Sequence, residues 1–305
     1  MADMTKMFNA YNKHLNIIRE LGITDRTDDY ICPLCLRGFS KDEIKELSLE
    51  DAPQEKLGGN KIAITCKHCN NTCGNSIDFH LINNVDFMER KYFLPGTSRK
   101  IKILNLGDGK PIEAKLRVSN KDNIELVIPN DYYNSKTYKE RLDMITKDAI
   151  TMVQDKPLVI DSQKVSCAII KNAYIILFSK TGYAFLLDNY YNRIREYIKN
   201  PKSFAFSYGM WKPICNTNCI DGVYLSNHKL CRGFYIIYTL SRKQEFRLIV
   251  YIPSPLLDFD DDAIAAFHEI KSGEGLLSQR LDKKTLLWEK DEIEALRQWV
   301  YTGDN

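Results

Sequence analysis

The chain contains no run of apolar residues that approaches the roughly 20 needed to cross a bilayer as a helix, so no membrane partner is expected. Its first segment, MADMTKMFNAYNKHLN, is polar and lacks the apolar core of a secretory signal, which favours a cytoplasmic location. Neither charge is in large excess, because 43 Lys+Arg stand against 40 Asp+Glu, and a net charge of +3 says little about partners. Internal repeats and low-complexity linkers are also missing.

The amino-acid composition is typical of a globular protein with hydrophobic cores. A hydrophobic content of 44% and a charged content of 27% support that class, and a length of 305 residues favours two domains. The chain has nine cysteines, which in a secreted protein would predict disulfides. Without an export signal they are better interpreted as metal ligands in a reducing compartment.

Two Cys-x-x-Cys pairs, Cys32/Cys35 and Cys66/Cys69, carry the strongest metal signal in the sequence. Each pair turns tightly enough to direct both sulfur atoms to one point, and tetrahedral zinc takes four thiolates from two such pairs. The alternative is that the four cysteines are simply buried core residues. In that case the two identical Cys-x-x-Cys spacings would have arisen by chance. Because four thiolates leave no open position for water, the predicted zinc site is structural.

Between and after these pairs lies an ordered series of acidic, turn-forming and amide residues. The acidic residues Glu50 and Asp51 come first, and a proline and a glycine pair follow them. An apolar strand at 62–64 then leads to the second cysteine pair, directly after which Asn70 stands. The members of the series before this strand are Glu50, Asp51, Pro53, Gly58, Gly59 and Asn60.

This order resembles the HNH endonuclease family, whose ββα-metal core is framed by two cysteine knuckles. The resemblance covers about the first third of the chain. It implies that Glu50 and Asn70 hold a catalytic divalent ion, Mg²⁺ or Mn²⁺, and that Asn60 ties the loop. The histidine that serves the family as general base is replaced here by Asp51. His80, in the helix that should follow Asn70, is the other candidate base, although a surface or structural histidine would look the same.

The activity that the resemblance implies is metal-assisted hydrolysis of phosphodiester bonds in DNA. The ion would stabilise charge on the scissile phosphate, and a base would deprotonate the attacking water. Stand-alone members of this family often serve in antiviral defence against phages or in mobile elements, so such a role is the expectation. The alternative hypothesis is a catalytically degenerate zinc-binding module that binds nucleic acid or a protein partner without cleavage.

Two further groups of residues have weaker functional interpretations. Lys56, Lys61 and Lys67 surround the motif and are candidates for contacts with a nucleic-acid backbone, although ordinary solvated lysines would give the same pattern. A second zinc site has spacings of Cys-x3-Cys and His-x2-Cys, which buried free cysteines would match equally. Its candidate ligands are Cys215, Cys219, His228 and Cys231.

The periodicity of apolar residues predicts an α+β fold. Residues 1–95 are expected to form an N-terminal zinc-stapled ββα-metal (HNH) module with a preceding helix at 4–21. Pro95-Gly96 marks the boundary to an α+β domain with an antiparallel sheet, residues 96–305, which would recognise a substrate, a protein partner or a second copy. The elements expected there include a helix at 138–152, a buried helix at 165–180 and strands at 204–207, 233–240 and 247–252.

Overall fold

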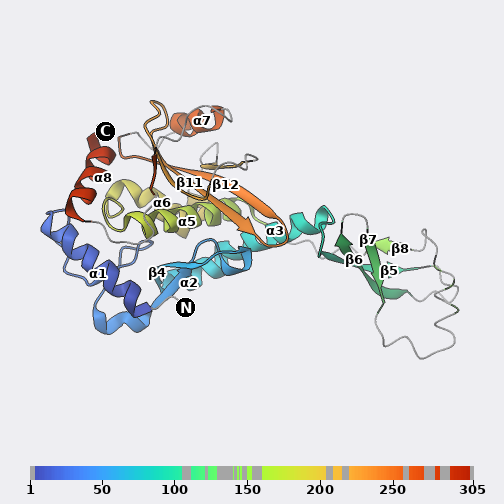
Figure 1. The fold of residues 1–305 in the computed structure, drawn as a ribbon. Coiled ribbons are helices and arrows are strands. Elements are labelled where there is room, and N and C mark those ends of the chain that lie inside the picture. The colour runs from blue at the N-terminus through green and yellow to red at the C-terminus, as the bar shows by residue number, and fades with distance from the viewer. Residues whose placement is uncertain are drawn as a thin grey trace. The chain divides into compact units, whose positions relative to one another are not determined.

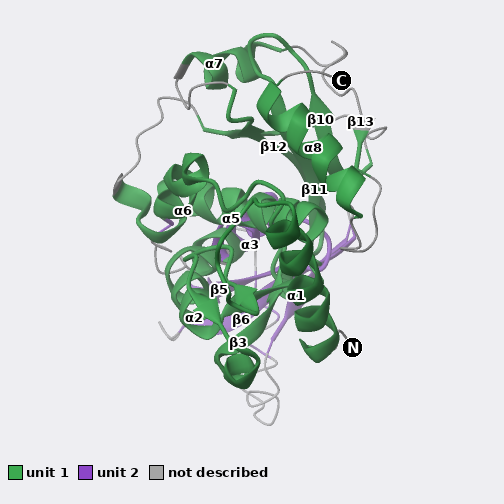
Figure 2. Cartoon of the chain, turned by 90° about the vertical axis from the view of Figure 1, so that its left-hand side faces the viewer, with its two compact units in different colours: residues 1–82, 161–305 green, residues 83–160 purple. Residues whose placement is uncertain are grey.

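The computed structural model describes residues 4–104, 111–120, 123–128, 140, 143, 145, 150–152, 160–203, 209–214, 220–256, 261–270, 279–281 and 289–302. The described residues form helices and antiparallel sheets, so the mixed helix-and-sheet class expected from the sequence is confirmed (Figure 1). The chain divides into two compact units, residues 1–82 with 161–305 (unit 1) and residues 83–160 (unit 2), which Figure 2 distinguishes by colour.

Unit 1 begins with a helix, a cysteine knuckle and a hairpin that leads into a second helix. Helix α1 (Met4–Glu20) buries one apolar face, as its periodicity predicted. Strand β3 (Leu47–Asp51) pairs antiparallel with β4 (Lys61–Cys66), and α2 (Lys67–Cys73) follows β4 directly. The other elements of this segment are β1 (Tyr30–Ile31), β2 (Gly38–Phe39), η1 (Lys41–Glu46), η2 (Glu55–Leu57), η3 (Gly74–Asp78) and α3 (Phe79–Lys91).

Helix α5 (Ser162–Thr181) is the central element of unit 1. Asp161 caps its N-terminus by accepting hydrogen bonds from two backbone N–H groups, and Gly182 ends it with a positive φ of 55°. The helix packs against β4 and η3 and against four strands of a five-stranded sheet (Figure 1). Because it has neighbours on both sides, it is buried almost all round, which explains why its sequence is apolar without a clear stripe.

The five-stranded sheet of unit 1 is antiparallel and has the strand order β13-β10-β11-β12-β9. Its longest pair, β11 and β12, confirms the hairpin that the sequence predicted at 233–252. The strands are β9 (Trp211–Pro213), β10 (Gly222–Ser226), β11 (Gly233–Ser241), β12 (Glu245–Pro253) and β13 (Gln279–Arg280). The helical elements are η6 (Asn189–Tyr191), α6 (Asn192–Lys199), η7 (Pro201–Ser203), α7 (Asp261–Glu269) and α8 (Lys290–Thr302). The strand expected at 204–207 lies outside the described residues.

Unit 2 contains a four-stranded antiparallel sheet with the order β7-β6-β5-β8. Alternating residues of β5 and β6 form a small core on one face, made of Ile101, Ile103, Ile112 and Ala114. The prediction of a helix at 138–152 is wrong for its last three residues, because these residues form a strand that pairs with β5. The strands are β5 (Ser98–Ile103), β6 (Ile112–Asn120), β7 (Asn123–Val127) and β8 (Ile150–Met152).

The division into units differs from the one expected at residue 95, since residues 161–305 pack with residues 1–82. A shared aromatic core joins these two segments. The ring of Tyr11 stacks on Phe178 with centroids 4.7 Å apart, and Tyr183 donates its hydroxyl to the Ile31 carbonyl over 2.8 Å. Helix α5 therefore completes the core beneath the first cysteine knuckle, and residues 83–160 are inserted into unit 1 along the sequence.

Candidate metal centre

The four cysteines predicted as zinc ligands come together in unit 1. Cys32 and Cys35 lie between β1 and β2, whereas Cys66 ends β4 and Cys69 lies in the first turn of α2. Their ligand atoms all lie within 4.8 Å of one another, and the Sγ atoms of Cys35 and Cys66 are 3.8 Å apart. A tetrahedral zinc centre with Zn–S bonds of about 2.3 Å has sulfur–sulfur edges of about 3.8 Å, so the cluster has the dimensions of a zinc site.

Backbone groups around the cysteines also fit a thiolate centre. The N–H of Cys66 points at Cys32 Sγ and the N–H of Cys69 at Cys66 Sγ, each over 3.4 Å. Contact with the neighbouring thiols, first that of Cys32, lowers the pKa of Cys66 to about 6. Three of the four cysteines are buried, so they could hold a zinc ion in a closed, structural centre that leaves no position for a reacting water.

A separate buried polar cluster surrounds Lys171 of α5. Its Nζ lies 2.6 Å from Glu50 Oε1 of β3 and 2.6 Å from Asp78 Oδ2 of η3. Lys171, Glu50 and Asp78 are only 0%, 2% and 6% exposed, so all three charged groups lie in the core. Thr65 donates its hydroxyl to the other Glu50 oxygen over 2.8 Å. Asp78 Oδ1 is buried and has no hydrogen-bond partner among the described residues.

The charges in this cluster keep the Lys171 ammonium protonated. Burial alone would lower the pKa of Lys171, but the carboxylates of Asp78 and Glu50 outweigh it and raise the pKa above its ordinary value. Asp51 is only partly buried; burial raises its pKa, while Lys61 and Lys171 act in the opposite direction. The cluster therefore contains one fixed cation that both Glu50 and Asp78 contact directly.

The residues predicted to hold the catalytic ion are engaged with protein groups. Both Glu50 oxygens have partners, namely Lys171 and Thr65. Asn70 directs its Nδ2 to Ser48 Oγ at 2.9 Å and to the Leu49 carbonyl at 3.1 Å. Within the part of the chain that the structure describes, the cysteine cluster is the only group of three or more Cys, His, Asp and Glu side chains placed to hold a metal ion.

The two candidate bases lie in different surroundings. Asp51 follows Glu50 across a register shift in the hairpin, where its strand partner is Lys61. His80 lies on α3, and its Nδ1 accepts the backbone N–H of Asp161 over 3.2 Å, next to the start of α5. That hydrogen bond occupies Nδ1 as an acceptor.

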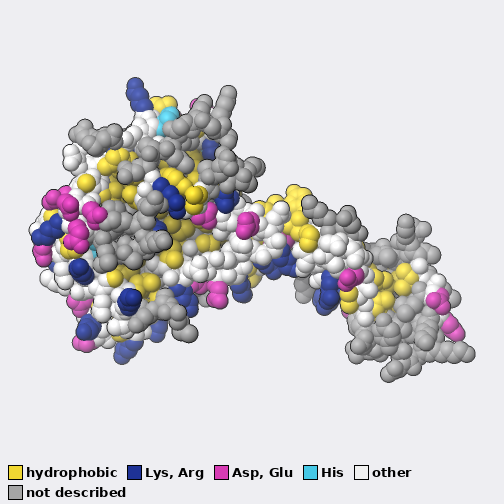
Figure 3. All heavy atoms as spheres, viewed as in Figure 1, with side chains coloured by type: hydrophobic (Ala, Val, Ile, Leu, Met, Phe, Trp, Pro, Cys, Tyr) yellow, Lys and Arg dark blue, Asp and Glu magenta, His cyan; other side chains and the backbone are white. Residues whose placement is uncertain are grey.

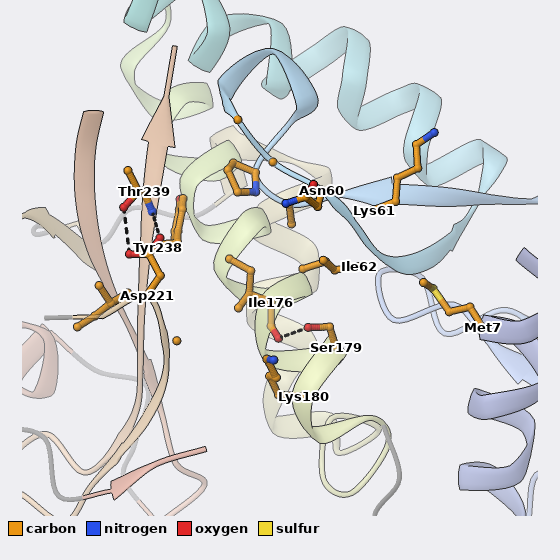
Figure 4. A pocket seen from close by; sticks show the side chains of 16 residues that line it. Met7, Asn60, Lys61, Ile62, Ile176, Ser179, Lys180, Asp221, Tyr238 and Thr239 are labelled. Atoms are coloured by element: carbon orange, nitrogen blue, oxygen red, sulfur yellow. Dashed lines mark hydrogen bonds between the residues drawn. The ribbon is translucent and has the colours of Figure 1, made fainter. Parts of the chain in front are cut away.

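Asn60 and the three lysines lie at the surface of unit 1. Asn60 is exposed at the hairpin loop, where its carbonyl accepts the N–H of Ala52 over 3.3 Å. Together with Lys61 it lines a pocket of about 470 Å³ between this loop, α5 and strands β10 and β11. Figure 4 shows the Lys61 side chain extending away from Lys180, so the two cations do not converge. Lys56 and Lys67 are also exposed.

The second candidate zinc set is described only in part. Cys215 and Cys219 lie outside the described residues. The other two candidates are neighbours, with Cys231 Sγ 3.2 Å from His228 Nδ1, and the Cys231 side chain is buried. Burial also raises the pKa of the Cys231 thiol, which is a property of a core cysteine. The set therefore remains a prediction.

The sequence interpretation missed two residues of the Lys171 cluster. Lys171 is the lone charge in the apolar run between Ala168 and Phe178, which is a position where an unpaired lysine would be costly. A single lysine in an apolar run therefore indicates a buried acidic partner, but it does not show which acid that partner is. Asp78 is 93 residues away in sequence, and no local pattern connects the two.

No protein-family model matches the chain, and no curated protein or solved structure matches it. The described helices include none that is both long enough and apolar enough to pass through a membrane. The functional interpretation therefore depends on the residues of unit 1 and unit 2 and on their geometry.

Proposed function

We propose that the protein is a zinc-stapled nucleic-acid-binding protein with an HNH-like hairpin and helix, in which Lys171 takes the place of a catalytic metal ion. The observation that carries this proposal is the pair of 2.6 Å contacts that Lys171 makes with Glu50 and Asp78. The first of these acids is the residue that the HNH resemblance assigns to the metal. In this proposal the core scaffold is retained and metal-assisted cleavage is not.

The chemistry of a lysine differs from that of a divalent ion in a way that decides the function. Mg²⁺ accepts oxygen ligands in an octahedral shell, usually keeps several waters, and stabilises charge on a phosphate. An ammonium supplies one positive charge but has no coordination position for a phosphate oxygen and a water together. Because Lys171 already contacts Glu50 Oε1, a metal at that oxygen would have to displace a fully buried cation.

The surroundings of the two candidate general bases, Asp51 and His80, support the same proposal. A general base must reach the water that it deprotonates and must be free to accept the proton. His80 has one ring nitrogen occupied by the Asp161 N–H, and Asp51 has replaced the histidine of the resembled family. Among the described residues, no contact brings either His80 or Asp51 next to both Glu50 and Asn70.

Exposed cations give the nucleic-acid part of the proposal its support. Unit 2 contains 14 Lys+Arg and 11 Asp+Glu, and the chain totals of 43 and 40 leave 29 of each sign for unit 1. The net positive charge of the chain therefore resides in unit 2. On the face of unit 1 seen in Figure 3, basic and acidic side chains are interspersed, so binding there would depend on the local lysines of the hairpin.

The sheet of unit 2 presents several of these cations on one face. Lys100 of β5 stands directly opposite Lys115 of β6. Lys102 and Arg117 lie on the same face, where their strand partners are Glu113 and Glu125. Like charges in directly opposed strand positions destabilise a sheet. A polyanion such as a nucleic-acid backbone would relieve this repulsion by neutralising the cations.

A metal-dependent endonuclease is the second candidate. It is favoured by the carboxylates of Glu50 and Asp78, because both contact the same Lys171 ammonium and would lie together without a cation if that ammonium moved away. In that case Lys171 would have to move away when Mg²⁺ or Mn²⁺ binds. The two candidates predict opposite results when magnesium is supplied with DNA.

The deciding experiment combines binding and cleavage. Binding of a labelled DNA duplex is measured by fluorescence anisotropy in buffer free of magnesium and manganese, and plasmid nicking is then measured with either ion added. We expect binding without nicking, and the double variant Lys100→Gln/Lys115→Gln should reduce the slope of log K against log salt by about 2. The matched control is Lys199→Gln/Lys202→Gln, which removes two exposed lysines of unit 1 near the end of α6.

The outcomes separate the candidates. Metal-dependent nicking that Glu50→Gln abolishes would establish the endonuclease and end the proposal. Failure to bind DNA and RNA, whether duplex or single-stranded, would also contradict the proposal. The binding partner would then be a protein or a second copy of this chain. Binding with an unchanged salt slope in the unit 2 variant would place the contacts on the hairpin lysines instead.

A further inference from the structure

A second, smaller pocket of unit 1 lies away from the Lys171 cluster. It has a volume of about 210 Å³ and is bounded by the segment before the first knuckle, by the segment after α5 and by helix α8. The residues that matter for its chemistry are Arg26, Leu36, Asp188, Arg297 and Tyr301. Residues from three distant parts of the chain thus meet around one space.

Arg297 is the most informative residue of this pocket. It is half-buried on α8, its Nη1 donates to the Ala184 carbonyl over 2.6 Å, and its guanidinium lies 4.9 Å from the centre of the Tyr301 ring. These contacts fix the plane of the guanidinium but neutralise no charge. Among the described residues Arg297 forms no ion pair, so a partly desolvated cation faces the pocket without a carboxylate.

Arg26 provides a second guanidinium in the lining of the pocket. Its Nε pairs with Asp28 over 2.8 Å and its Nη1 donates to the Leu36 carbonyl over 2.7 Å. The remaining N–H groups of Arg26 have no partner among the described residues. Two guanidinium groups with fixed planes are well suited to hold an oxyanion, because each can donate two parallel hydrogen bonds.

The one acid that lines the pocket is already occupied by other donors. Asp188 Oδ1 accepts the N–H of Tyr190 and its Oδ2 accepts the Tyr301 hydroxyl, each over 2.8 Å. Asp188 therefore holds Tyr301 in place and does not pair with either arginine. Asp28 compensates the charge of Arg26, so the cation of the lining that has no carboxylate partner among the described residues is Arg297.

We infer that this pocket binds a small organic oxyanion, a carboxylate or a phosphomonoester, between Arg26 and Arg297. The apolar side chains of Ile23, Leu36 and Leu187 line the same space and would contact the non-polar part of the ligand. Pockets for drug-sized ligands usually measure about 300–1,000 Å³, so this one fits a smaller molecule. The inference does not depend on nucleic-acid binding or on the Lys171 cluster.

Binding would link the C-terminal helix to the segment beside the first knuckle. Arg297 belongs to α8 and Arg26 lies a few residues before Cys32, so an anion between them would tie these segments through charge-assisted hydrogen bonds. Ligands that bind only the native state raise its apparent stability with concentration. A metabolite of this class could in this way act as a signal that stabilises unit 1.

The test is isothermal titration calorimetry with three probes: inorganic phosphate, propionate and glycerol phosphate, at constant ionic strength. We expect saturable binding of at least one probe, and Arg297→Gln and Arg26→Gln should each weaken it by about tenfold or more. The matched control Arg193→Gln removes an exposed arginine of α6 and should leave the affinity unchanged. Selective binding of propionate or of the phosphate probes identifies the source of the oxyanion.

Two results would overturn the inference. One is the absence of saturable binding of all three probes to the wild-type protein. The other is an affinity in the arginine variants that equals that of the wild type. Arg26→Gln and Arg297→Gln lie on different segments, so one of them remains informative if the other fails to fold.

Discussion

Replacing Lys171 with methionine removes the central charge of the buried cluster and tests whether that charge is required. The methionine side chain has a similar length, so it fills most of the same volume in α5. The variant leaves the carboxylates of Glu50 and Asp78 facing one another at 2% and 6% exposure with no cation between them. We expect a severe loss of stability that a cavity alone would not produce.

The magnitude follows from the burial of the groups. Breaking a buried ion pair by removing one partner typically costs about 3–5 kcal/mol, because the remaining charge is desolvated without compensation. Here one substitution leaves two acids unpaired, so the upper part of that range is expected. For a unit of this size each kcal/mol corresponds to a shift in Tm of roughly 2–4 °C, so a loss of about 4–5 kcal/mol gives a decrease of roughly 8–20 °C.

The assay is urea unfolding followed by circular dichroism, with Lys56→Met as the matched surface control. The triple variant Glu50→Gln/Lys171→Met/Asp78→Asn carries no charge in the cluster and should recover more than half of the loss. A loss for Lys171→Met below about 1 kcal/mol, similar to the control, would refute the reasoning.

Three further predictions concern other parts of unit 1. Metal analysis should find one zinc ion per chain, and Cys66→Ser or a strong chelator should abolish it and lower Tm sharply, whereas Cys167→Ser should leave the zinc content unchanged. Burial lowers the pKa of His14 to about 4, so the unfolded state takes up the proton first. Stability should therefore fall by about 3 kcal/mol in total as pH decreases from about 6.5 to about 4, and His14→Gln should flatten this dependence in urea titrations. Asp161→Ala should cost about 1 kcal/mol in the same assay through the lost cap of α5, while Asp161→Asn keeps the cap and should cost less.

Local patterns in the sequence predicted much of the fold. The β3–β4 hairpin follows from short apolar strands around a glycine-rich turn, and the cysteine cluster follows from two matched spacings. The buried helix α5 was predicted from the length of its apolar run. In each case the determinants lie within a few residues of one another, which is the range over which periodicity and spacing carry information.

Features that depend on distant segments could not be predicted in the same way. Ile150–Met152 form a strand because β5 offers a free edge, and this pairing overrides the helical pattern of the preceding residues. The ion pair between Lys171 and Asp78 and the packing of residues 161–305 on residues 1–82 also depend on tertiary contacts. The pocket between Arg26 and Arg297 belongs to the same class, since its walls are more than 260 residues apart in sequence.

The insertion of residues 83–160 into unit 1 has a consequence for the order in which the protein is made. During synthesis the cysteines of both knuckles leave the ribosome well before Lys171, so zinc can bind while Glu50 and Asp78 still lack their cation. The hairpin and α5 become joined only after the whole of unit 2 has been synthesised. A nascent chain stopped before residue 160 should therefore hold zinc yet remain sensitive to protease in its first 82 residues, and release of the full chain should remove that sensitivity.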